Sequence, residues 1–129
     1  MIKFCIALIF FFVSNFSSAQ QHFADSLKLI INLNTQDKKE VNALAYLIKN
    51  TPDFDDALNY ARQGLLLAKK IDYKKGEADC NLILADLFEG KVQTESIQYA
   101  LNALDIYDKL QDNIGIASSH LVLQANYKD

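Results

Sequence analysis

The chain has 129 residues, enough for one domain or for the front part of a larger protein. Half of the residues are hydrophobic and 22% are charged, which is typical of a folded globular protein and excludes general disorder. Thirteen Lys and Arg against sixteen Asp and Glu give a net charge of −3, so no basic field exists for nucleic acid, and no nucleic-acid partner is expected.

The first nineteen residues have the three-part pattern of a secretory signal peptide. Lys3 supplies a positive start, an apolar run covers residues 4–13, and Ser17-Ser18-Ala19 is a small-residue cleavage site. A transmembrane anchor is the alternative, but it needs about 20 apolar residues, and this run is too short. We therefore expect cleavage before Gln20, export to the periplasm or the extracellular space, and no stable membrane insertion afterwards.

The rest of the chain is expected to form consecutive helices, as its few glycines and single proline favour. Asp37 and Asp53 are expected to cap two of these helices, and Pro52 prevents them from joining. No segment of useful length alternates with period two, so no strand is expected. Helices are expected over residues 25–33, 37–49, 53–71, 75–89, 94–110 and 114–127, with the first lying in an N-terminal segment over 20–36.

The later helices repeat with a period of 39 residues. When residues 57–90 are placed on 96–129, eight positions are identical. The identical pairs are Tyr60 and Tyr99, Ala61 and Ala100, Leu65 and Leu104, Lys70 and Lys109, Gly76 and Gly115, Ala78 and Ala117, Leu82 and Leu121, and Leu84 and Leu123. Self-similarity at this spacing indicates stacked helical hairpins. They would be 37–71 and 76–110, followed by an unpaired helix over 114–127.

First helices of the hairpins carry Leu44-Ala45 with Ile48 and Leu84-Ala85 with Phe88. Second helices carry small residues such as Ala61 and Ala100, which we expect to be buried where two helices cross. Over residues 37–129 this pattern resembles the tetratricopeptide repeat (TPR) family, although the chain has no Trp and its period exceeds the usual 34. It is similar to the longer repeats that precede the membrane segment of many exported bacterial sensor kinases and regulators. The resemblance implies an all-α fold of antiparallel hairpins stacked as a short TPR-like solenoid. A generic helical bundle is the alternative.

The residue patterns do not point to catalysis. His22 and His120 have no metal-ligand spacing, and CxxC, HExxH and Gly-rich phosphate-loop motifs are all missing from the sequence. Cys80 lies in an apolar helical stretch, where a cysteine is usually a small core residue. We therefore expect a protein that is not an enzyme, with no catalytic residue, cofactor or metal.

The resemblance implies a groove lined by the first helix of each hairpin, which receives a peptide or a helix of a partner protein. For each residue placed in this groove, a solvated helix side is the alternative. Two functions follow: an exported protein-binding adaptor, or the sensory N-terminal region of a larger membrane signalling protein, either a histidine kinase or a transcription regulator. The groove candidates, taken by position, are Asn42, Tyr46, Lys49, Asp79, Asp86 and His120.

The final helix is expected to have two apolar stripes on nearly opposite sides. The stripe expected to pack on the preceding hairpin consists of Ile114, Ala117, Leu121 and Ala125. The stripe expected to be bare consists of Ile116, Leu123 and Tyr127. A homodimer, further C-terminal repeats or a larger parent protein would each cover the bare stripe.

Overall fold

The computed structural model describes residues 20–128, which form six helices and no strand, so this part of the chain is all-α. From residue 38 onward, every helix begins and ends within one residue of its expected bounds. The N-terminal helix already includes residue 20, whereas its expected start is 25, and the expected signal peptide over 1–19 lies outside the described residues. The helices are 20–32, α2 (Lys38–Asn50), α3 (Phe54–Lys70), α4 (Lys74–Phe88), α5 (Gln93–Leu110) and α6 (Asn113–Asn126).

Local signals in the sequence explain where the helices begin and end. The carboxylate of Asp37 accepts a hydrogen bond from the backbone N–H of Glu40 at 3.0 Å, and that of Asp53 accepts one from Asp56 at 2.9 Å. These side chains satisfy backbone donors that have no partner within the helix. Beyond the end of α4, Gly90 has a φ of +70°, a left-handed conformation that glycine adopts without steric cost.

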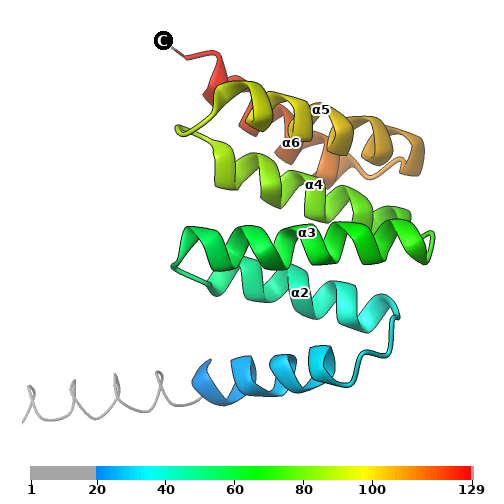
Figure 1. Cartoon of the computed structure of the whole chain (residues 1–129). Helices are drawn as coiled ribbons and strands as arrows, with labels where there is room; N and C mark the ends of the chain where they lie inside the picture. The colour runs from blue at the N-terminus through cyan, green and yellow to red at the C-terminus, as the bar shows by residue number, and fades with distance from the viewer. Residues whose placement is uncertain (1–19, 129) are drawn as a thin grey trace, which may run out of the picture.

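From α2 onward, helices that follow one another along the chain also pack against one another (Figure 1). In addition, α4 contacts both α2 and α6, so it lies in the middle of the row. The buried apolar residues form four clusters between adjacent helices, and α4 contributes to each of them. Ala61 of α3 and Ala100 of α5, expected at helix crossings, are completely buried in two of these clusters.

The two apolar stripes of α6 are placed the other way round from the prediction, which is therefore wrong. Leu123 is only 8% exposed and Ile116 packs on the cluster that contains Tyr107, whereas Ile114 is 81% exposed and Leu121 66%. Of the stripe that was expected to be bare, Tyr127 alone is exposed. The reason is that α6 has apolar residues on two sides, and only its neighbours α4 and α5 decide which side is buried.

Candidate partner-binding groove

A hollow of about 400 Å³ lies between α2 and α4, and we call it the α2–α4 groove. Most of its lining comes from these two helices, and Tyr107 of α5 closes one end. Small and apolar residues alternate with charged ones, so the hollow offers both hydrophobic contact and charge. The lining residues are Asn42, Ala45, Tyr46, Lys49, Lys75, Asp79, Leu82, Ile83, Asp86 and Tyr107.

The structure brings five of the six groove candidates together in this lining: Asn42, Tyr46, Lys49, Asp79 and Asp86. The sixth, His120, does not line the groove and is exposed on α6. The sequence-based reasoning missed Lys75 and Leu82, although both lie within one helical turn of Asp79 and share its side of α4. Tyr107 was not among the groove candidates either, and the packing of α5 on α4 brings this residue to the groove.

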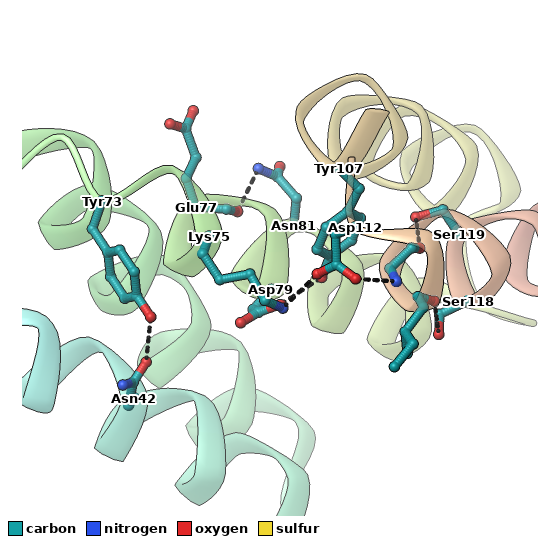
Figure 2. Close-up of polar contacts among 12 residues, drawn as sticks. Asn42, Tyr73, Lys75, Glu77, Asp79, Asn81, Tyr107, Asp112, Ser118 and Ser119 are labelled. Carbon is teal, nitrogen blue, oxygen red and sulfur yellow. Dashed lines mark hydrogen bonds and ion pairs between the residues drawn. The ribbon is translucent and has the colours of Figure 1, made fainter. Parts of the chain in front are cut away.

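One end of the groove is held by a network of polar contacts (Figure 2). The Tyr107 hydroxyl donates to Asp79 Oδ1 at 2.6 Å, and Lys75 Nζ donates to the same oxygen at 2.5 Å. Lys75 Nζ also lies 3.3 Å from Asp112 Oδ2 and 5.0 Å from the centre of the Tyr107 ring. The network connects α4, α5 and the N-cap of α6, so the charges at this end of the groove are paired.

Burial and charge change the acid–base behaviour of these groups. Burial raises the pKa of Tyr107, and its hydrogen bond to the Asp79 carboxylate raises the pKa further. Burial lowers the pKa of Lys75, but hydrogen bonds and charge from Asp79 and Asp112 outweigh it, so the net change is upward. The backbone N–H of Gly115, followed by Lys75, lowers the pKa of Asp112. Tyr107 therefore stays a neutral donor, while Lys75 and Asp112 stay charged.

The other end of the groove carries the opposite charges of Lys49 and Asp86. Neither side chain is part of an ion pair within 4 Å in residues 20–128. Burial raises the pKa of Asp86, as does the charge of Glu89, while Lys49 acts in the opposite direction. Tyr46 is 40% exposed, and its ring meets that of Phe23 edge-on at 4.9 Å, so the N-terminal helix supports this rim.

A second hollow of about 440 Å³ adjoins the groove and reaches from α4 to α6. Its lining is mainly polar, and Asp86 lies in the lining of both hollows. Asp86 is therefore shared by the two hollows. The remaining lining residues are Glu89, Gly90, Gln93, Ala125, Asn126 and Lys128.

The described residues contain few groups suited to chemistry. Within residues 20–128 no three or more His, Cys, Asp and Glu side chains gather closely enough to hold a metal ion. Cys80 is completely buried in the cluster with Val41 and Ala68, and burial raises the pKa of its thiol to about 12. As for membranes, every helix in the described part is too short or too polar to cross one.

We compared the chain with protein-family models, curated proteins and solved structures. No family model, no curated protein and no solved structure matches the chain. The interpretation of the groove therefore depends on its own residues.

Proposed function

We propose that this protein is an exported, non-catalytic protein-binding module of the TPR type, and that the α2–α4 groove receives a peptide or a helix of its partner. The observation that carries the proposal is the groove itself. In the repeat, α2 and α4 are the first helices of successive hairpins. Residues from both line one hollow, as a groove for an extended ligand requires.

The surface of the groove suits a peptide better than a small polar molecule. Ala45, Leu82 and Ile83 supply apolar contact for a hydrophobic side chain. Lys49 and Asp86 lie in the same lining as these apolar residues and can pair with charges on the ligand. The side chains at the opposite end are already held by the hydrogen bonds to Asp79. Ligand binding there therefore costs little side-chain entropy.

Two further features support a TPR-type array and export. Neighbouring helices pack in sequence order, with alanines completely buried where α3 and α5 cross their neighbours. The pattern of residues 1–19 supports export. The TPR-type array and the export of the protein are therefore both parts of this proposal.

A peptide-display selection on the chain from Gln20 onward tests the function. Selected peptides should lose at least about tenfold in affinity when Asp86 is changed to Lys or Tyr46 to Ala, because both side chains line the groove. Asp108→Lys is the matched control, since Asp108 is exposed on α5 and does not line the groove. Equal loss in all three variants, or no loss in the groove variants, would contradict the proposal. Melting temperatures of the variants show whether each is folded.

A further inference from the structure

The α2–α4 groove continues into the polar hollow of about 440 Å³ between α4 and α6, which we call the α4–α6 hollow. Asp86 lines both, and α4 contacts both α2 and α6. A ligand that lies across α4 therefore contacts the apolar part of the groove and the polar hollow together.

The α4–α6 hollow carries two neighbouring carboxylates. Asp86 belongs to α4 and Glu89 is its C-cap residue, three positions further on, so both lie on the same side of the helix. Neither carboxylate is part of an ion pair within 4 Å in residues 20–128. Two adjacent carboxylates repel each other, and a ligand cation bound between them would remove this repulsion.

The charges that act on Asp86 are negative on balance. Burial is the largest cause of its raised pKa, the charge of Glu89 is the next, and Lys49 acts in the opposite direction with a smaller effect. Lys128 also lines the hollow, but it does not contribute to this shift. The hollow is therefore complementary to a positive group on the ligand.

The amide side chains of the hollow add hydrogen-bond acceptors. Asn126 is only 7% exposed, and its Nδ2 donates to Ser96 Oγ at 2.8 Å and to the backbone carbonyl of Val122 at 2.9 Å. Both amide hydrogens are thereby used inside the protein, so this side chain has only its oxygen left for a ligand. Gln93 Nε2 donates to the backbone carbonyl of Asn126, which holds a second amide in the lining. Carboxylate and amide oxygens together suit a group with several N–H donors.

We propose that the α4–α6 hollow binds an arginine side chain of the partner peptide, while an apolar side chain of the same peptide occupies the α2–α4 groove. This inference rests on the proposed function and adds the chemistry of the partner to it. The planar guanidinium group has five N–H donors and can bind several oxygens at once, whereas a lysine ammonium group acts as a point charge. Arginine is therefore expected to bind more tightly than lysine.

The distance between the two hollows sets the spacing of the peptide motif. Packed helices lie about 8–10 Å apart, so successive hollows along the row of α2, α4 and α6 are separated by about one such step. An extended chain advances about 3.3 Å per residue, so about three residues cover this distance. The partner is therefore expected to carry arginine about three positions from an aliphatic or aromatic residue.

Selection from a random peptide library on the chain from Gln20 onward tests this chemistry. Wild type should select peptides with arginine about three positions from an apolar residue, and Glu89→Lys should select peptides without the arginine. Glu89 lines the α4–α6 hollow but not the α2–α4 groove, so the apolar preference should remain. Asp108→Lys makes the same charge change at an exposed site outside both hollows, and should select the wild-type motif. Loss of the arginine in both variants would overturn the inference.

The tightest-binding peptide selected on wild type then serves as the probe in fluorescence anisotropy. Replacing its arginine by glutamine should weaken binding to wild type about tenfold, and should have a smaller effect on binding to Glu89→Gln. Peptides that need Tyr46 but carry no arginine, or that carry acidic residues instead, would overturn this inference and leave the proposed function standing. A selection without binders, or binding that is insensitive to both Tyr46→Ala and Asp86→Lys, would overturn both. Unchanged melting temperatures confirm that the variants are folded.

Discussion

Gly76 and Gly115 occupy equivalent positions of the repeat, and each lies against a tyrosine ring. A Cβ atom on Gly76 would overlap the ring of Tyr73 and the side chain of Val41, and one on Gly115 would overlap the ring of Tyr107. Both glycines are in ordinary helical conformation, so the need for glycine here is one of space rather than of backbone angle. A glycine near the start of a helix in this repeat therefore marks the place where an aromatic ring packs.

Changing Gly115 to Ala should destabilise the protein by about 1–3 kcal/mol, because the ring of Tyr107 is buried and its hydroxyl is bonded to Asp79. Helix propensity alone predicts the opposite, a gain of about 1 kcal/mol. Urea unfolding measures the difference. Gly64→Ala is the graded control, since a Cβ there would lie 3.0 Å from Cys80 Sγ and needs only a small shift. A Gly115→Ala protein as stable as wild type would show that the ring does not lie against this helix.

The Ser96 and Asn126 side chains form a buried polar link that the sequence did not reveal. Asn126 Nδ2 donates to Ser96 Oγ at 2.8 Å, and Ser96 Oγ donates to the backbone carbonyl of Ala85 at 2.8 Å. The link connects α6, α5 and α4. Ser96 and Asn126 are thirty residues apart, so no local pattern could pair them.

At the scale of helices, alanines allow the close approach of α3 and α5 to their neighbours. Ala61 and Ala100 are both completely buried, and each belongs to an apolar cluster between helices. Larger side chains at these positions would force the helices apart. This burial confirms the expectation from the repeat, in which the two alanines hold equivalent positions.

Replacing Ala61 or Ala100 by Phe should destabilise the protein by about 1–3 kcal/mol through overpacking. Asn59→Phe and Gln98→Phe serve as controls, because these residues are exposed on the same two helices. Thermal unfolding followed by circular dichroism should show lower melting temperatures for the alanine variants alone. Unchanged melting temperatures in both alanine variants would mean that the helices do not cross at these residues.

For the whole molecule, the N-terminal pattern predicts a mature chain that begins at Gln20. The positive start, the apolar run and the small-residue end match a cleaved signal, and the run is too short for an anchor. Intact mass of the protein expressed with its natural N-terminus in a bacterial host measures the cleavage. Loss of residues 1–19 and recovery outside the cytoplasm are expected. Protein that retains Met1 and sediments with membranes would contradict export.

The location and ends of the helices could be predicted from sequence because their signals are local. Capping aspartates, Pro52 and Gly90 act within a few residues of a helix end, and apolar periodicity identifies the helices between them. Five of the six residues that the register of the repeat assigned to a groove line one hollow in the structure. The sixth, His120, is exposed on α6 outside this hollow.

Only the tertiary structure decided which face of α6 is buried and that Tyr107 closes the groove. Since α6 has apolar residues on two sides and no charge, its own sequence favours neither face, and contact with α4 and α5 decides between them. Tyr107 is brought to Asp79 by the packing of α5 on α4, across 28 residues of sequence. Local patterns determine where helices form, whereas contacts between distant residues determine which of their faces are buried and which are left to bind.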